Sequence, residues 1–398
     1  MRRSSAVISA TILLIAASMA RTAGEGRPIV EQSFDSVLGG IPCFYGIANG
    51  SPIYFLLDTG GAGSLIDRAA AERLRMKIAE GAQASVANAE RATVGVILES
   101  TVGVGEATVD TRLVVPQLKP LQPIFGRPVE AILGGDFLQK NVVELDYKRQ
   151  VLKIYKPEFF SPFQRAVSVP LTMVNGIPFV ELQVALPNGK SIRGMFLVDS
   201  GGVMDIHIHK SIADREHLVT DLPGRGETGV GIGGASSRFA YRGQEAIIGS
   251  FHLKKPIVVV TQDTAGQRAN PNSIGLVGMG LLAKFHLAFD YSRSQLWLKP
   301  ENGYEDANVY DATGLLLRSD PPSFSSVHIS LIREGTPAQD AGLRVGDVIV
   351  RVDHRDATKS GVNELRRVLN RPNRTILLEV RRTGEFLRFK MKTRELLP

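Results

Sequence analysis

The sequence predicts a mainly β protein made of two related lobes, followed by a smaller C-terminal α+β module. Three observations predict this fold class. Many of the 40 glycines lie in turns between short apolar runs, which favours strands over long helices. A long part of the chain repeats itself. Residues 334–353 then follow a different pattern, in which a short helix, a glycine turn and a buried strand succeed one another.

The repeat begins with two closely similar motifs. Each is an apolar run that ends in an aspartate, a hydroxyl residue and two glycines: Asp58-Thr59-Gly60-Gly61 and Asp199-Ser200-Gly201-Gly202. The two aspartates are 141 residues apart, and three further pairs follow in the same order. These pairs are Ile132-Leu133-Gly134 with Leu276-Val277-Gly278, Asp146-Tyr147 with Asp290-Tyr291, and Lys156-Pro157 with Lys299-Pro300. Their nearly constant spacing indicates a duplication in which each copy forms a lobe.

Proline-rich and glycine-rich breaks divide the rest of the chain. We expect a leader over residues 1–24, a first lobe over 25–160, a second lobe over 161–303 and a separate module over 304–398. Within the lobes, runs such as residues 180–184 alternate at the period of a strand. Neither lobe contains the long helical patterns that a parallel α/β sheet requires.

The first residues have the features of a secretory leader. Arg2 and Arg3 precede an apolar stretch over residues 6–20, and small residues stand near its end. We therefore expect an exported protein, periplasmic or secreted, with membrane attachment only if the leader is retained as an anchor. Cys43 is the only cysteine, so no intramolecular disulfide can form, and this favours a bacterial periplasmic protein.

The net charge of +7 does not indicate a nucleic-acid partner. The sequence has no long Lys/Arg run and no basic stripe with interleaved aromatic residues, so the charge is interpreted as a solvated surface.

On its two Asp motifs and the Gly-containing segments that follow them, the chain resembles the aspartic peptidases of the retropepsin-like or pepsin-like kind, with both lobes on one chain. The resemblance covers about residues 40–300 and implies a two-lobed β-barrel fold with internal duplication. It implies that Asp58 and Asp199 form the catalytic pair, supported by Thr59, Gly60, Ser200 and Gly201. Gly61 and Gly202 stand where Ala or Ser is commonest in that family.

The chemistry of the pair agrees with this interpretation. Two close carboxylates cannot both ionise cheaply, so they share one proton over a range of pH. The charged carboxylate can then take a proton from an attacking water, while the protonated one donates a hydrogen bond to the developing oxyanion. This reaction requires no metal and no other cofactor.

Three other motifs suggest different chemistry. Ser200 lies in a context similar to the nucleophile motif of trypsin-like proteases, but all seven histidines follow it in the sequence, whereas that family places its histidine earlier. Residues 229–234 fit a dinucleotide-binding fingerprint, but no helix is predicted after them. A flap over the cleft, with Gly231, Gly233 and Gly234 near its tip, suits this segment better, and residues 85–95 are the weaker counterpart. Asp205, His207 and His209 share a strand and could bind a metal, but no third ligand motif accompanies them.

The C-terminal module resembles a bacterial, protease-associated PDZ domain, because of the sequence Ala341-Gly342-Leu343 followed by Gly346-Asp347 and a buried strand. That family binds the end of a peptide or protein through a loop that offers backbone N–H groups to the terminal carboxylate. Here the best match for that loop is Gly314-Leu315-Leu316-Leu317, which lacks the second glycine of the commonest form.

The resulting hypothesis is an exported aspartic endopeptidase that hydrolyses extended polypeptides, with a PDZ domain that recruits a substrate or partner. One alternative is a catalytically silent periplasmic protein that uses the same cleft and PDZ groove to hold peptides. Another is a peptidase that stays inactive until a segment is removed, with residues 25–40 or the PDZ domain as the inhibitory part.

Overall fold

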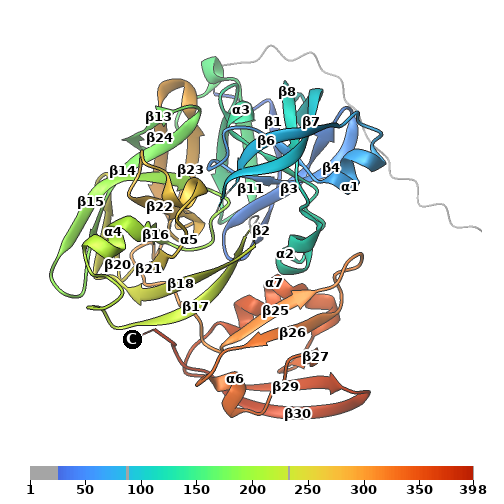
Figure 1. Cartoon of the computed structure of the whole chain (residues 1–398), viewed down its shortest axis with the longest axis vertical. Helices are drawn as coiled ribbons and strands as arrows, with labels where there is room; N and C mark the ends of the chain where they lie inside the picture. Colours follow the sequence, from blue (N-terminus) through green and yellow to red (C-terminus); the bar gives the residue numbers. More distant parts are fainter. Residues whose placement is uncertain (1–25, 87–88, 232–233, 398) are drawn as a thin grey trace, which may run out of the picture.

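The structure is a computed structural model that describes residues 26–86, 89–231 and 234–397, so the predicted leader lies outside the described residues. The fold is mainly β, as predicted, and its strands form four sheets. Figure 1 shows two lobes side by side and the C-terminal module below both of them. No helix in the described part of the chain is long and apolar enough to cross a membrane.

The first lobe is built on an eight-stranded sheet. In spatial order its strands are β2 (Asp35–Val37), β3 (Ile41–Ala48), β4 (Ser51–Leu57), β9 (Ala131–Leu133), β5 (Leu65–Ile66), β8 (Ala107–Val115), β7 (Ala89–Val104) and β6 (Ala79–Val86). Its helical segments are α1 (Arg68–Arg73), η1 (Lys119–Leu121), α2 (Gln122–Phe125) and α3 (Gly135–Leu138). The first lobe is therefore rich in strands, as predicted, and its helices are short.

The second lobe repeats the plan of the first. Its strands run in the order β17 (Gly224–Gly231), β18 (Gly234–Arg242), β21 (Ile257–Thr261), β16 (Ile206–Ile208), β22 (Gly275–Gly278), β15 (Ser191–Asp199), β14 (Ile177–Ala185), β19 (Glu245–Ile248) and β20 (Phe251–Lys254), with β13 (Thr172–Val174) beside β14. Its helical segments are α4 (Lys210–Arg215), η3 (Gly266–Ala269), α5 (Met279–Leu282) and η4 (Tyr291–Arg293). The parallel pair β15–β22 corresponds to the parallel pair β4–β9 in the first lobe.

A third sheet joins the lobes, and the sequence analysis did not anticipate it. Its order is β1 (Val30–Ser33), β11 (Val151–Tyr155), β10 (Val142–Asp146), β23 (Phe285–Asp290), β24 (Gln295–Pro300) and β12 (Val167–Pro170), with η2 (Pro157–Phe159) after β11. Each lobe contributes half of these strands, and the antiparallel pair β10–β23 crosses the boundary. Leu145 and Leu287 lie opposite each other in that pair, and both are fully buried in one core cluster that extends through both lobes.

The C-terminal module has its own core. Its sheet contains β25 (Leu315–Ser319), β26 (Val327–Ile332), β27 (Val348–Val352), β29 (Thr375–Arg382) and β30 (Glu385–Lys392), with β28 (Arg355–Asp356) beside β27. Its helices are α6 (Pro337–Asp340) and α7 (Ala357–Leu369). Asp356 caps the start of α7 by accepting a hydrogen bond from the N–H of Thr358, and Gly361, with a φ of +70°, kinks the helix just before its longer part over residues 362–369. β25 is an edge strand of this sheet and α7 packs beside it, so the free edge of β25 can pair with another segment of chain.

A buried polar cluster lies where the two lobes share their sheet. Tyr155 Oη donates to Glu144 Oε2 at 2.8 Å, and His286 Nε2 from the other lobe lies 2.9 Å from Glu144 Oε1. Burial raises the pKa of Glu144, but the hydrogen bonds with His286 and Tyr155, together with the positive charge of Lys153, outweigh it and hold the pKa below its ordinary value. Glu144 therefore links the two lobes as a carboxylate.

We predict that Glu144→Ala lowers the free energy of unfolding by about 3–5 kcal/mol at neutral pH, because it leaves buried polar partners unpaired. Since the folded-state pKa is lowered, this loss is largest above the unfolded-state pKa and shrinks as the pH falls through the folded-state value. Urea unfolding at several pH values measures it. The control Glu181→Ala breaks an exposed pair with Arg193 and should cost less than about 1 kcal/mol. Equal losses in the two variants would contradict the prediction.

Candidate active site

The two aspartates of the repeated motifs end equivalent strands. Asp58 directly follows β4, and Asp199 is the last residue of β15. Each of these strands pairs in parallel with the strand that carries the downstream glycine segment, β9 or β22. The duplication therefore brings both carboxylates to the boundary between the lobes.

The glycine after each aspartate allows the carboxylates to approach closely. A Cβ atom on Gly60 would lie 3.1 Å from a carboxylate oxygen of Asp58 and 3.1 Å from one of Asp199. A Cβ atom on Gly201 would likewise lie 3.1 Å from Asp58 Oδ1 and 3.3 Å from Asp199 Oδ1. Both carboxylates thus lie against both loops, and a side chain at either glycine would crowd them.

Backbone donors fix the orientation of each carboxylate in the same way. The N–H of Gly60 donates to Asp58 Oδ1 at 2.8 Å, and the N–H of Gly201 donates to Asp199 Oδ1 at 2.9 Å. The arrangement is therefore close to twofold symmetric at the level of single hydrogen bonds.

The hydroxyl residues cross from one lobe to the other. Thr59 Oγ1 donates to the carbonyl of Val198 at 2.6 Å and accepts from the N–H of Ser200 at 2.9 Å. Ser200 Oγ donates to the carbonyl of Leu57 at 2.8 Å and accepts from the N–H of Thr59 at 2.9 Å. Both side chains are fully buried. These four hydrogen bonds connect the two loops. Because the Ser200 hydroxyl both donates and accepts in this network, the arrangement disfavours Ser200 as a nucleophile.

A glycine segment supports each loop from behind. The N–H of Gly135 donates to the carbonyl of Gly61 at 2.8 Å, and the N–H of Met279 donates to that of Gly202 at 2.7 Å. A Cβ atom on Gly134 would lie 2.4 Å from the carbonyl oxygen of Gly63, so this approach requires a glycine. Gly278 meets the equivalent constraint in the second lobe, because its Cβ would lie 2.4 Å from the Met204 carbonyl oxygen.

The environment of the pair favours a shared proton. Burial raises the pKa of Asp58 above its ordinary value, although hydrogen bonds from the N–H of Gly60 and from Asp199 favour the ionised form. At a pH where an exposed aspartate is ionised, Asp58 therefore retains its proton more readily. One protonated and one charged carboxyl is the state that such a pair adopts.

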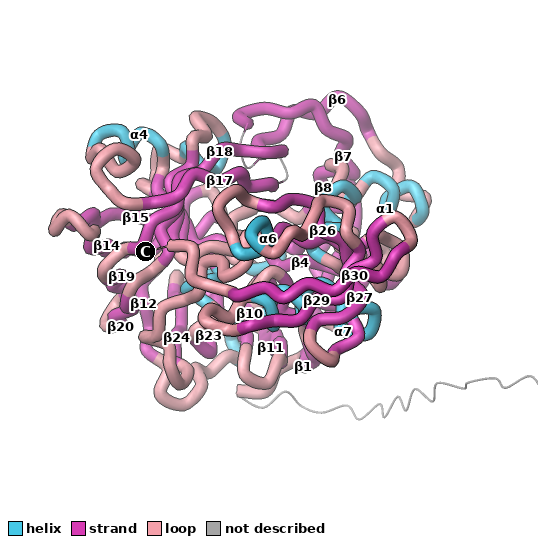
Figure 2. The backbone as a smooth tube through the Cα atoms, turned by 90° about the horizontal axis from the view of Figure 1, so that it is seen from below, coloured by secondary structure: helices cyan, strands magenta, loops and turns pink. Residues whose placement is uncertain are grey.

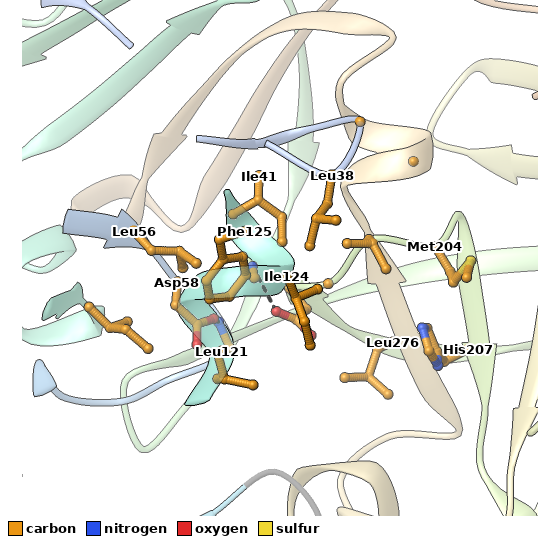
Figure 3. Close-up of a pocket in the computed structure, with 18 of the residues that line it drawn as sticks. Leu38, Ile41, Leu56, Asp58, Leu121, Ile124, Phe125, Met204, His207 and Leu276 are labelled. Atoms are coloured by element: carbon orange, nitrogen blue, oxygen red, sulfur yellow. Dashed lines mark hydrogen bonds between the residues drawn. The ribbon is translucent and has the colours of Figure 1, made fainter. Parts of the chain in front are cut away.

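The aspartates open into a cavity of about 820 Å³ whose two sides differ. Large apolar side chains cover the first-lobe side, among them Leu121, Ile124 and Phe125 on or next to α2, and Figure 3 shows them near Asp58. The second-lobe side includes Met204, Leu276 and His207. Further lining residues on that side are polar: Asp205, Arg238 and Asn308. The cavity therefore suits a chain with an apolar side chain on at least one side of the aspartates.

The other predicted site residues lie in three places. Gly231 and Gly234 are at the end of the β17–β18 hairpin, whereas Gly233 lies outside the described residues. This hairpin and its counterpart β6–β7 lie on the same side of the molecule in Figure 2. In the module, the N–H of Gly314 donates to Asp311 Oδ1 and that of Leu315 to Thr313 Oγ1, while Leu316 lines the cavity and Leu317 lies on β25. Their role as a carboxylate-binding loop stays a prediction.

The histidine motif does not assemble a metal site in the described part of the chain. No group of three or more His, Cys, Asp or Glu side chains in metal-binding proximity occurs there. Asp205 instead accepts hydrogen bonds from the N–H of Ile257 and from Asn308 Nδ2. Burial lowers the pKa of His209 to about 4, so its ring is neutral at physiological pH. Cys43 is fully buried in an apolar cluster of the first lobe.

Sequence reasoning missed α2 and its surroundings. The segment Leu118–Val129 contains few residues with recognisable chemistry, so no motif marks it as part of the cavity wall. Asp67, the N-cap of α1, fixes the start of the segment 118–129. Its carboxylate accepts hydrogen bonds from the N–H groups of Leu118 and Lys119 at 2.6 and 3.1 Å.

Two parts of the chain match known domain families. Residues 45–137 match the family model described as aspartyl protease, and residues 328–382 match the one described as PDZ domain. The chain therefore contains an aspartyl protease domain and a C-terminal PDZ domain, which confirms the predicted architecture. The first match contains Asp58 and ends at Phe137, within the first lobe.

Searches for individual relatives add little. No curated protein matches the chain. Among solved structures, the photosystem II D1 C-terminal processing protease is similar at 22% identity over 21% of this chain and 23% of that one, with a TM-score of 0.20. The chain thus spans about a quarter of that protein's length, and so limited a similarity supports no conclusion about fold or activity.

We predict that Thr59→Val lowers the free energy of unfolding by about 1–3 kcal/mol, because the N–H of Ser200 and the carbonyl of Val198 both lose their buried hydrogen-bond partner. Thr59→Ser keeps the hydroxyl and should lose much less. Chemical unfolding of both variants measures the difference. Equal stability of the Val and Ser variants would show that the crossing hydrogen bonds contribute nothing.

We also predict that Asp58→Asn changes how stability depends on pH. Because the folded-state pKa of Asp58 is raised, its contribution to stability is fully present below the unfolded-state pKa and is lost as the pH rises through the folded-state value. Asparagine cannot ionise, so the variant should gain stability relative to wild type as the pH rises from acid to neutral. Thermal unfolding across this range measures it. Absence of this gain in Asp58→Asn would contradict the raised pKa of Asp58.

Proposed function

We propose that the protein is an aspartic endopeptidase in which Asp58 and Asp199 activate a water molecule for attack on a peptide carbonyl. The observation that carries the proposal is the approach of both carboxylates to the same two glycines, each oriented by its own backbone N–H. The match of the first lobe to aspartyl proteases supports the reaction class.

The mechanism follows from the protonation of the pair. The ionised carboxylate accepts a proton from water as the water oxygen bonds to the scissile carbonyl carbon. The protonated carboxyl donates a hydrogen bond to the carbonyl oxygen, which gains negative charge in the tetrahedral intermediate. The proton acquired from water then passes to the leaving amine as the C–N bond breaks. The Thr59–Ser200 hydrogen bonds keep both groups in place throughout.

The cavity supports an extended polypeptide as the substrate. Apolar side chains on the first-lobe side, including Leu121, Ile124 and Phe125, favour an apolar residue next to the scissile bond. We propose that the hairpins β6–β7 and β17–β18 cover the bound chain. The PDZ domain supports peptide binding, and we propose that its partner is a peptide or protein C-terminus.

A silent peptide-binding protein is the competing function. The PDZ domain favours it, since peptide binding there needs no catalysis. The two functions differ in what the aspartates do, because a binding protein needs neither a shared proton nor a water.

We further propose that the protein is exported. The support is the basic start and apolar stretch of residues 1–24, which lie outside the described residues. Mass spectrometry of the N-terminus of the protein isolated from its native cell separates a cleaved leader from a retained anchor, and recovery of the intact leader in the cytosol would contradict export.

We predict that the purified protein cleaves an unfolded polypeptide at acid to neutral pH, and that Asp58→Asn and Asp199→Asn each lower kcat at least about 10³-fold, because neither variant can both accept and donate the required protons. Mass spectrometry of the products measures cleavage, and circular dichroism confirms that the variants are folded. The exposed control Asp110→Asn should retain wild-type activity. Cleavage by both folded Asn variants at the wild-type rate would contradict the proposal.

A further inference from the structure

The PDZ domain contacts both lobes beside the cavity. On the first-lobe side, Asn363 of α7 donates through Nδ2 to the carbonyl of Phe125 at 2.7 Å and accepts at Oδ1 from the N–H of Leu38 at 3.2 Å. On the second-lobe side, Arg225 of β17 donates to the carbonyl of Glu334 at 2.6 Å. Leu397, near the end of the chain, packs in a buried cluster with residues of β18 and β21. The PDZ domain therefore bridges the two lobes.

The end of α2 lies in the groove between β25 and α7. Gly126, the C-cap of α2, has a φ of +63° and contacts both walls. A Cβ atom on it would lie 2.1 Å from Val362 Cγ1 on α7 and 3.2 Å from Ser319 Oγ on β25. Figure 1 shows α7 directly below α2. The chain's own α2 thus occupies the side of the groove that a bound peptide would enter.

The polar groups of the groove are also engaged within the chain. Arg366 of α7 donates to the carbonyl of Leu317 on the edge strand β25 at 2.6 Å, and to Asn363 Oδ1 at 3.0 Å. A peptide that adds to the edge of β25 needs that carbonyl for its own backbone N–H. The groove is therefore closed by bonds that a ligand must replace.

The opposite face of α2 forms part of the cavity. Leu121, Ile124 and Phe125 line it together with Asp58. The PDZ domain also contributes Leu316, Arg333 and Asn370 to the same lining. An extended chain that leaves the cavity on this side meets the PDZ domain, so any movement of α2 changes both the groove and the cleft.

We propose that the PDZ domain is a clamp, which holds α2 against the cleft and restricts the passage of long polypeptides. An extended peptide with a free C-terminal carboxylate that pairs with β25 displaces α2 from the groove and opens this end of the cleft. The effect on cleavage rests on the proposed peptidase function, whereas the clamp itself does not.

Hydrogen exchange tests the clamp without catalysis. In the full-length chain, Asn363→Ala should make the amides of residues 118–129 exchange about tenfold faster, since it removes the hydrogen bond from Asn363 Nδ2 to the carbonyl of Phe125 that holds this segment. Gly126→Ala should act in the same direction, because its methyl group cannot fit against Val362. Arg367 lies one turn further along α7, and its side chain donates hydrogen bonds to Glu364 on the same helix. Arg367→Ala therefore serves as the matched control. Unchanged exchange over residues 118–129 in both test variants would overturn the clamp.

Ligand and substrate provide the second arm. Short synthetic peptides with randomised C-terminal residues and a free carboxylate should accelerate exchange of residues 118–129 in wild type, and the same peptides with amidated ends should not. Asn363→Ala should raise kcat/KM several-fold for an unfolded protein, and by less for a short peptide that fits within the cavity. No acceleration by the free-acid peptides, or equal changes for long and short substrates, would overturn ligand-driven opening.

The outcomes separate the two proposals. If all forms are inert towards polypeptides while the variants exchange faster over residues 118–129, the clamp stands and the peptidase function fails. If wild type cleaves and exchange does not change, the peptidase function stands and the clamp fails.

Discussion

The structure depends on the need to hold two partly buried carboxylates close together across a boundary between lobes. Their mutual repulsion and their burial both disfavour this arrangement. The hydroxyls of Thr59 and Ser200 stabilise the arrangement with four hydrogen bonds that cross between the lobes. The shared sheet adds a second constraint, because β10 and β23 pair along the same boundary. The lobes therefore cannot separate without breaking a sheet and a buried polar network together.

On this symmetric base the two sides of the cleft have diverged. The strands, the glycine segments and the Asp loops correspond between the lobes, but the walls above them do not. The first lobe places α2 and its apolar side chains beside Asp58, while the second presents Asp205, His207 and Arg238. Under the proposed function, this asymmetry gives a bound peptide one preferred direction and register, which a twofold symmetric cleft cannot do. It also gives the PDZ domain one particular element, α2, to contact.

The sequence predicted the parts of this molecule that depend on local motifs. Asp58 and Asp199 were identifiable because a strand, a turn and two glycines recur in the same order, and the module was identifiable because its Gly346-Asp347 turn precedes a buried strand. The shared sheet was not predictable, since β10 and β23 pair across about 140 residues and alternation within a strand does not specify its partner. The role of α2 depends on contacts with Asn363 and Val362 from a distant module, and no local pattern encodes these.

The most direct test of the central claim is a ¹³C NMR titration of the aspartate side-chain carboxyl carbons in wild type and in Asp199→Asn. If the two carboxyls share one proton, the wild-type pair will titrate in two well-separated steps that both report on Asp58 and Asp199. In Asp199→Asn, the remaining carboxyl of Asp58 will titrate in a single step. Two independent titrations at the ordinary aspartate value, unchanged by the substitution, would contradict the account of a coupled pair.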